Sequence, residues 1–426
     1  MKSTNPWTWI PTLYFSQGLP YVVVMTLSVV MYKNLGVSNT DIALYTSWLY
    51  LPWVIKPLWS PLVDLLGSKR RWVVAMQFGV GAAFACVALT LPAPKFLQMT
   101  LAVFWLMAFA SATHDIAADG FYMLALPQQQ QAAFVGVRST FYRMAMIGGQ
   151  GGLVYLAGWL AERPGGDFIS AWQGVFWLLA ALFALAALYH LWALPRPALD
   201  GPAPRSATFW ADFGAVFMAF FRKPEVWRVL LFLLLYRFAE AQLLKLVTPF
   251  MLDPRDIGGL GLKTQDVGIA YGTVGITALT LGGLLGGWVI SRLGLKRVLW
   301  PLVICMHAPN TVFVWLALAQ PTNLWVVSAG VAVEQFGYGF GFTAYMVYML
   351  MIAGGPDGNS PHKTAHYALC TGFMALGMMI PGMWAGWLQD QLGYVQFFVW
   401  ACIATIPSFI ATALIRIDPN FGRKAA

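Results

Sequence analysis

Ser111-Ala-Thr-His-Asp-Ile-Ala-Ala-Asp-Gly-Phe-Tyr122 lies inside a long apolar run from about residue 101 to residue 126. A run of this length predicts a helix that crosses a membrane. Asp115 and Asp119 are four residues apart, so they lie on one helix face, one turn from each other. A charged carboxylate at the centre of a bilayer costs roughly 2.5–3.5 kcal/mol on insertion scales. We therefore expect both to face inward, toward a cation, water or a transported solute.

The composition extends this interpretation to the whole chain. Of 426 residues, 59% are hydrophobic and only 10% are charged, and the mean hydropathy is +0.65. Soluble domains are typically near 45–50% apolar and about 25% charged. Apolar runs of about twenty residues recur along the chain. The sequence therefore predicts an all-α, multi-pass membrane protein.

The apolar runs predict about twelve transmembrane helices in two sets of six. We place them at about residues 7–31, 42–65, 72–94, 98–125, 133–161, 170–194, 225–251, 265–291, 298–319, 324–353, 364–389 and 394–416. This gives an N-terminal bundle at 1–194, a linker at 195–224 and a C-terminal bundle at 225–426. The linker starts as a Pro-rich, solvated segment, and residues 209–223 predict an amphipathic helix on the membrane surface.

The basic residues set the expected orientation. With both termini cytoplasmic, roughly fifteen Lys and Arg fall in inner loops and about five in outer loops, as the positive-inside rule requires. This asymmetry accounts for the net charge of +9, and we expect no nucleic-acid partner. Only Lys2 precedes the first apolar run, and no cleavage site follows it, so we expect no signal peptide. The four cysteines fall in predicted spans, so we expect no disulfide framework and no thiolate metal site.

An internal repeat relates the two halves. Ser60-Pro-Leu-Val-Asp-Leu-Leu-Gly-Ser-Lys-Arg-Arg71 follows the second span, and Gly287-Trp-Val-Ile-Ser-Arg-Leu-Gly-Leu-Lys-Arg297 follows the eighth. Both are a helix end, a glycine and a basic turn. This pair resembles the loop signature of the major facilitator superfamily, although Ser291 replaces the acid of the second copy. The resemblance implies two pseudo-symmetric six-helix bundles and a cytoplasmic gate that includes Asp64 and Arg71.

Ionisable residues inside the predicted spans are few and are not evenly scattered. The acids fall on spans 4, 7 and 10, which line the central cavity of a two-bundle transporter. Each has a structural alternative: Asp115 or Asp119 could neutralise Arg138 or Arg143, and Arg237 and Glu240 could pair along one helix face. The residues placed within spans are Lys56, His114, Asp115, Asp119, Arg138, Arg143, Arg237, Glu240, Lys245 and Glu334.

Polar and aromatic residues on the expected lining helices could contact a sugar-bearing ligand, although most aromatics in such a protein serve packing. They are Tyr14, Gln17, Tyr21, Tyr122, Tyr236, Gln335, Tyr338 and Tyr345. His362 and His366 are four residues apart, but they lack a third ligand for a metal. We find no catalytic constellation, so we expect no enzyme, cofactor or bound metal. The Gly-rich run Leu281–Gly287 predicts close helix packing.

Tyr14-Phe-Ser-Gln-Gly-Leu-Pro-Tyr21 is similar to the opening motif of the family of AmpG-type muropeptide permeases and their acetyl-CoA-transporter-like relatives. Trp53-Val-Ile-Lys-Pro-Leu-Trp-Ser-Pro-Leu-Val-Asp64 resembles its Lys-x-x-Trp-x-Pro-x-x-Asp. Ser111–Asp119 resembles Ser-Ala-Thr-Gln-Asp-Ile-Ala-x-Asp, with His114 where Gln is common. Further matches are Tyr236-Arg-Phe-Ala-Glu240, Glu334 and Thr364-Ala-His-Tyr-Ala-Leu369, where His366 again replaces Gln.

The resemblance implies a monomeric, proton-coupled importer of cell-wall turnover fragments, which are amino-sugar peptides, in the lipid of a bacterial inner membrane. It implies proton-coupling roles for Asp115, Asp119, Glu240 and Glu334. Combined with the lining residues, it gives as substrate-binding candidates Gln17, Tyr21, Lys56, Tyr122, Arg138, Arg143, Arg237, Gln335 and Tyr338. Two alternatives stay open: a transporter or exporter of another solute such as a siderophore, peptide or drug, and a transporter-like membrane enzyme or receptor.

Overall fold

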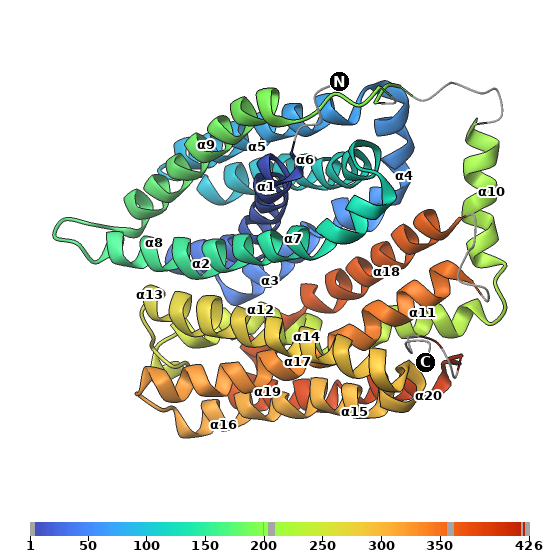
Figure 1. Ribbon diagram of the computed structural model, residues 1–426. Coiled ribbons are helices and arrows are strands. Elements are labelled where there is room, and N and C mark those ends of the chain that lie inside the picture. The colour runs from blue at the N-terminus through green and yellow to red at the C-terminus, as the bar shows by residue number, and fades with distance from the viewer. Residues whose placement is uncertain (1–4, 199, 203–208, 356–361, 419–420, 422–426) are drawn as a thin grey trace. The chain divides into compact units, whose positions relative to one another are not determined.

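The computed structural model describes residues 5–198, 200–202, 209–355, 362–418 and 421, apart from the side chains of Asp64, Gln128, Ala132, Val135 and Phe209. Within these residues every regular element is helical (Figure 1), which confirms the all-α prediction. The described chain divides into two units, and each is considered by itself.

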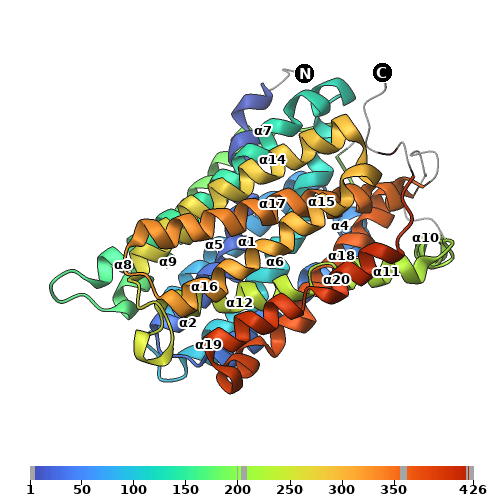
Figure 2. The ribbon, with the colours of Figure 1, turned by 90° about the horizontal axis from the view of Figure 1, so that it is seen from below.

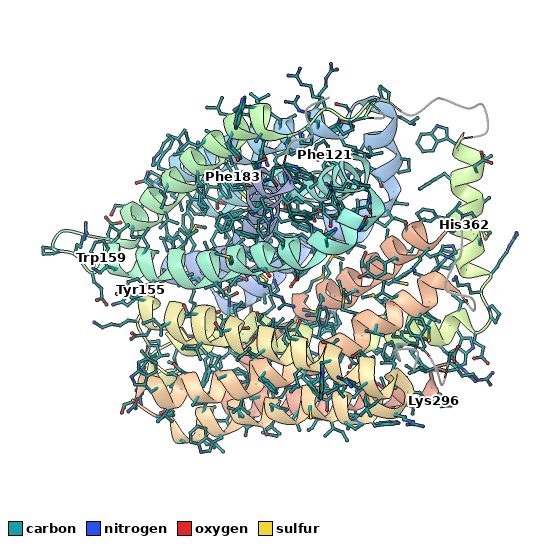
Figure 3. The ribbon with its side chains drawn as sticks, viewed as in Figure 1. Phe121, Tyr155, Trp159, Phe183, Lys296 and His362 are labelled. Atoms are coloured by element: carbon teal, nitrogen blue, oxygen red, sulfur yellow. The ribbon has the colours of Figure 1, made fainter. Side chains whose placement is uncertain are left out.

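The first unit comprises residues 1–36 and 55–205. Its core lies where α5 packs against α6 and α9. Phe84 of α5 has its ring centroid 5.2 Å from that of Phe183, and Phe183 and Phe121 lie in the interior of the unit (Figure 3). Its elements are η1 (Pro6–Thr8), α1 (Ile10–Val22), η2 (Val23–Leu27), α2 (Ser28–Asn34), most of α4 (Leu51–Leu66), α5 (Lys69–Thr90), α6 (Phe96–Ala125), α7 (Gln128–Met146), η3 (Ile147–Leu153), α8 (Val154–Ala161) and α9 (Phe168–Ala193).

The second unit comprises residues 37–54 and 206–426, so α3 groups with the C-terminal helices and packs on α18 and α19. The predicted boundaries of the two bundles, 1–194 and 225–426, stay a prediction. The elements of this unit are α3 (Asn39–Trp48), α10 (Phe209–Phe221), α11 (Val226–Leu235), α12 (Phe238–Leu252), η4 (Arg255–Ile257), α13 (Thr264–Val267), η5 (Gly268–Gly275), α14 (Ile276–Leu293), α15 (Leu295–His307), η6 (Ala308–Asn310), α16 (Thr311–Ala319), α17 (Leu324–Gly354), α18 (Lys363–Met383), α19 (Ala385–Ile403) and α20 (Ile406–Leu414).

Side-chain caps and glycines place several helix ends. Ser38, Ser68 and Asp167 accept hydrogen bonds from backbone N–H groups in the first turns of α3, α5 and α9, donors that would otherwise lack a partner. Gly393 has a φ of 74° inside α19, a conformation that favours glycine. It breaks this helix between the eleventh and twelfth predicted spans.

Close packing of α14 on α17 depends on glycines, as the Gly-rich run predicted. Figure 2 shows these two helices running side by side. A Cβ atom on Gly282 or Gly286 would overlap or press on a backbone carbonyl of α17, and one on Gly339 would overlap the carbonyl of Leu279. Small residues let helix backbones approach closely where lipid gives no hydrophobic drive for association.

The lipid-facing character of the helices is visible in what they expose. Nine helical segments of the described chain are long and apolar enough to cross a membrane. Large apolar side chains are left exposed, among them Leu106 at 70% and Trp192 at 81%. Soluble monomers rarely expose extensive apolar surface, so these surfaces fit a lipid environment. The chain is a multi-pass membrane protein.

Candidate functional site

In the first unit, α6 carries the two acids that the sequence singled out, and each has a basic partner. Asp115 Oδ2 lies 3.6 Å from Lys56 Nζ of α4, and Asp119 Oδ1 accepts a hydrogen bond of 2.8 Å from Arg138 Nη2 of α7. Asp119 therefore makes the ion pair with Arg138 that a purely structural role would require. However, the Asp119 side chain is 40% exposed, and an ion pair this exposed adds little stability. Such a pair can open for a ligand at small cost.

Two tyrosine rings enclose the Arg138 guanidinium. Its central carbon lies 4.5 Å from the ring centroid of Tyr14 and 5.1 Å from that of Tyr122, close enough for cation–π attraction. The Tyr14 hydroxyl donates to Asp119 over 3.3 Å, and the Tyr122 hydroxyl donates to the Gln131 carbonyl over 2.5 Å. Tyr122 is a predicted ligand contact. Because its hydroxyl already has a hydrogen-bond partner, mainly its ring is available to contact a ligand.

A chain of polar contacts, buried except at Thr12, links four helices of the unit. Thr12 Oγ1 of α1 lies 2.9 Å from His190 Nε2 of α9, and His190 Nδ1 lies 2.9 Å from Gln77 Oε1 of α5. The Gln77 amide nitrogen in turn lies 3.1 Å from His114 Nε2 of α6. Because His114 adjoins Asp115 in sequence, this chain fixes the rotation of the helix that carries the acids. His190 and Gln77, polar residues inside apolar spans, were a signal that sequence reasoning did not use.

The other predicted residues of this unit lie on α1, α4, α5 and α7. Gln17 is buried on α1, and its Oε1 atom has no hydrogen-bond partner among the described residues. Tyr21 on α1 and Arg143 on α7 are partly buried. Arg71 is exposed in the first turn of α5. The side chain of Asp64 lies outside the described residues, so the predicted gate of Asp64 and Arg71 stays a prediction.

In the second unit, the seventh predicted span is broken next to its ionisable residues. α11 ends at Leu235 and α12 starts at Phe238, because Arg237 has a non-helical backbone (φ −110°, ψ 21°). A break leaves carbonyls without helical partners, and here hydroxyls replace the missing donors. Ser408 donates to the carbonyls of Leu235 and Tyr236 over 2.8 Å, and Tyr345 donates to Leu233 over 2.5 Å.

The break changes the predicted pairing of Arg237 with Glu240. The Arg237 guanidinium donates a hydrogen bond to the Tyr338 hydroxyl and lies 4.9 Å from the ring centroid of Phe342. Its charge acts on Glu240, but both Glu240 carboxylate oxygens lack a hydrogen-bond partner among the described residues. The electrostatic attraction is therefore present without the hydrogen bond expected of an intrahelical pair.

Glu240 and Glu334 form a buried pair of acids on α12 and α17. Both residues have 0% of their surface exposed, and the charge of Glu240 acts on Glu334. Glu334 Oε2 accepts a hydrogen bond of 2.9 Å from Gln335 Nε2, whereas Oε1 has no partner in the described chain. Tyr271 of η5 lies near both acids. Two adjacent carboxylates without water are a high-energy arrangement that a proton relieves.

A buried lysine completes the ionisable residues of α12. Lys245 Nζ donates a hydrogen bond of 2.9 Å to Thr46 Oγ1 of α3 and lies 5.3 Å from the Tyr50 ring centroid. The sequence placed Lys245 inside a span but gave no reason to choose it. Its environment depends on α3, which is distant in sequence.

The structure therefore gathers the predicted residues into two groups, one in each unit. The first contains Lys56, Asp115, Asp119, Tyr122 and Arg138, and the second contains Arg237, Glu240, Glu334, Gln335 and Tyr338. That the acids of the fourth, seventh and tenth spans line one passage stays a prediction.

The two histidines at the start of α18 serve a structural contact. His362, labelled in Figure 3, has its ring centroid 5.7 Å from that of His366. His366 Nε2 lies 3.3 Å from the Val216 carbonyl oxygen of α10, and its ring packs edge-on against Phe220. His366 therefore holds α10 against α18. Among the described residues, no group of three or more His, Cys, Asp or Glu could hold a metal ion.

Comparison with known proteins gives a consistent result. Residues 12–360 match the sequence model of the Major Facilitator Superfamily. The chain is 29% identical over 418 residues to the anhydromuropeptide permease of Escherichia coli, covering 96% of this chain and 80% of that protein. Its fold is similar to a mutant of the nucleoside transporter NupG (TM-score 0.71, 18% identity, 97% and 100% coverage). It is also similar to a bacterial homologue of the human lysosomal transporter Spinster (TM-score 0.67, 16% identity, 97% and 98% coverage).

Proposed function

Because the chain belongs to the major facilitator superfamily and is a secondary transporter, we propose that it imports anhydro-muropeptides together with protons. These cargo molecules are amino-sugar peptides released by cell-wall turnover. The observation that carries the coupling proposal is the fully buried pair of Glu240 and Glu334. The similarity to the permease of Escherichia coli along 96% of this chain supports the cargo.

The first group of residues has the chemistry to bind such a cargo. Tyr14 and Tyr122 present aromatic faces, which suit sugar rings, around a guanidinium that suits a peptide carboxylate. Asp119 holds Arg138 until a ligand competes for it. Lys56 and Asp115 form a second, longer pair at 3.6 Å. A ligand carboxylate can therefore exchange with a protein carboxylate at low electrostatic cost.

The second group supplies the proton site. A proton shared by Glu240 and Glu334 removes the repulsion between two carboxylates sealed from water. When the site opens to water, the same carboxyl groups can ionise and release it. Binding of cargo and proton drives the change between outward-open and inward-open states only by as much as their affinities differ between these states.

The proposal places the protein as a monomer in the bacterial inner membrane with both termini cytoplasmic, following its basic-residue distribution. Asp64 and Arg71 act in the cytoplasmic gate, and Gln17, Tyr21, Arg143, Arg237, Gln335 and Tyr338 complete the cargo contacts.

Uptake into proteoliposomes tests the proposal. Radiolabelled anhydro-muropeptide is supplied with and without an inward proton gradient, and accumulation is expected only with the gradient. Accumulation that ignores the gradient would overturn the coupling. Absence of muropeptide uptake, together with transport of a siderophore, peptide or drug, would favour the alternative cargo. Release of preloaded cargo driven by the inward proton gradient would favour export.

A further inference from the structure

Lys245 is a buried cation whose surroundings differ from those of the other basic residues in the candidate site. It lies on α12 with 5% of its surface exposed. Lys56 and Arg138 each contact a carboxylate, whereas the described contacts of Lys245 are the Thr46 hydroxyl and the Tyr50 ring. No carboxylate in the described part of the chain lies within 4.0 Å of Lys245 Nζ or exerts a resolved charge effect on it.

An ammonium in this position lacks most of the partners that it can bind. Lysine has three N–H donors, and Thr46 accepts from one of them. Burial of a charge without a counter-charge is strongly unfavourable. The cation–π contact with Tyr50 compensates only part of that cost. An anion that arrives during the transport cycle would satisfy both the charge and the remaining donors.

A second orphaned polar group lies beside the lysine stem. Ser47 has 0% of its surface exposed, and its hydroxyl has no hydrogen-bond partner among the described residues. A Cβ atom on Gly382 of α18 would lie 2.7 Å from Ser47 Oγ and 3.5 Å from Lys245 Cγ. A side chain at this position would therefore press on the serine hydroxyl, and both the hydroxyl and the lysine stem pack against this part of α18. The unpaired hydroxyl is available as a donor to an anion that reaches Lys245.

We propose that Lys245 and Ser47, with Thr46 holding the ammonium in place, bind a carboxylate of the transported cargo. An ammonium and a hydroxyl on one carboxylate form charge-assisted hydrogen bonds, about twice as strong as neutral ones. This subsite rests on the proposed function, because anhydro-muropeptides carry peptide carboxylates. It is separate from Arg138, which already has Asp119 as its partner.

The test compares two cargo molecules on purified full-length protein. One is the anhydro-muropeptide with free carboxylates, and the other has every carboxyl converted to a carboxamide. Lys245→Met is expected to raise the Kd of the free-carboxylate cargo about 10- to 100-fold, the effect of losing a hydrogen bond to a charged group. The Kd of the carboxamide cargo should change less than about threefold. Lys245→Arg, which keeps the charge, should restore part of the preference.

Two further variants keep the result interpretable. Lys296→Met removes an exposed lysine of α15 (Figure 3) and should leave both Kd values unchanged. If Lys245→Met does not fold, Ser47→Ala should weaken the carboxylate cargo alone, by about 2- to 10-fold. An equal loss for both cargo molecules, or none for either, would overturn the subsite while leaving the proposed function intact. If the unaltered protein binds neither cargo, the proposed function fails and the subsite fails with it.

Discussion

Replacing Glu334 by Gln removes the ionisable group that the proposed proton coupling uses, while keeping the shape of the side chain. Glu334 is completely buried on α17, one oxygen accepts from Gln335, and Glu240 is its acidic neighbour. An amide oxygen can keep the hydrogen bond from Gln335, so Glu334→Gln resembles the protonated acid. We expect the variant to remain in the membrane and to bind cargo, but to lose the ability to exchange a proton.

The size of the effect follows from these contacts. Two neighbouring buried carboxyl groups do not both ionise readily, so we expect one exchanged proton per cycle. A difference of one pH unit is worth about 1.4 kcal/mol per proton, which supports tenfold accumulation at zero membrane potential. Glu334→Gln should reduce the ratio of internal to external cargo from about 10 to about 1. The substitution breaks no ion pair within the described residues, so the free energy of unfolding should change by less than about 1 kcal/mol. Breaking a buried ion pair would instead cost about 3–5 kcal/mol.

Two measurements on the same proteoliposomes separate binding from coupling. With the membrane potential clamped, accumulation of radiolabelled cargo is followed under a pH difference of one unit. Counterflow, in which preloaded unlabelled cargo drives entry of labelled cargo, needs no net proton movement. Glu334→Gln should retain counterflow and lose accumulation. Asp212→Asn, which removes one exposed charge from α10, should behave like the unaltered protein in both assays.

Tenfold accumulation by both Glu334→Gln and Glu240→Gln would contradict a coupling role for these acids. The buried pair would then have no part in energy coupling. Loss of counterflow together with accumulation, in a variant with unchanged thermal stability, would instead assign Glu334 to cargo binding.

Three further predictions concern the contacts that position the site. Gln77→Leu removes the partner of His114 Nε2 and of His190 Nδ1, while His190 Nε2 keeps its contact with Thr12. Leaving buried polar atoms unpaired costs about 1–3 kcal/mol each, so the melting temperature in detergent should clearly fall. An unchanged Tm would contradict the buried chain. Gly339→Ala forces α17 away from a carbonyl of α14 and should cost about 1–3 kcal/mol in unfolding free energy, while Gly152→Ala, with nothing within 4 Å of its added Cβ, should be neutral by the same measurement. Hydrogen bonds from the backbone and side chain at the start of α9 hold the pKa of exposed Asp167 below its usual value. Asp167→Ala should therefore lower Tm at neutral pH, where the ionised carboxylate contributes stability. It should no longer lower Tm once the pH falls below the folded-state pKa of Asp167.

The fold class could be predicted from the sequence because each membrane span is a single run of consecutive apolar residues. Length and apolarity predict a span without knowledge of its neighbours, and the Gly-rich run Leu281–Gly287 predicted close packing that the backbone geometry of Gly282 confirms. Both acids of α6 were found because charge in an apolar run is conspicuous on its own.

Partners distant in sequence could not be predicted in the same way. Arg237 could pair with Glu240 along one face of a continuous helix, but the break at Arg237 directs its guanidinium to Tyr338. Lys245 attracted no role because Ser47 and Thr46 reach it from α3, about two hundred residues earlier in the chain. Such contacts depend on tertiary packing, which the sequence pattern of one segment does not predict.

The most direct test of proton-coupled transport is the pH of the medium when cargo is added. Lightly buffered proteoliposomes receive anhydro-muropeptide with the membrane potential clamped, and an external electrode records proton movement. We expect the medium to become more alkaline as cargo enters, with about one proton per cargo molecule, and we expect Glu334→Gln to abolish this change. Entry of cargo into vesicles of the unaltered protein with no change in external pH would contradict it.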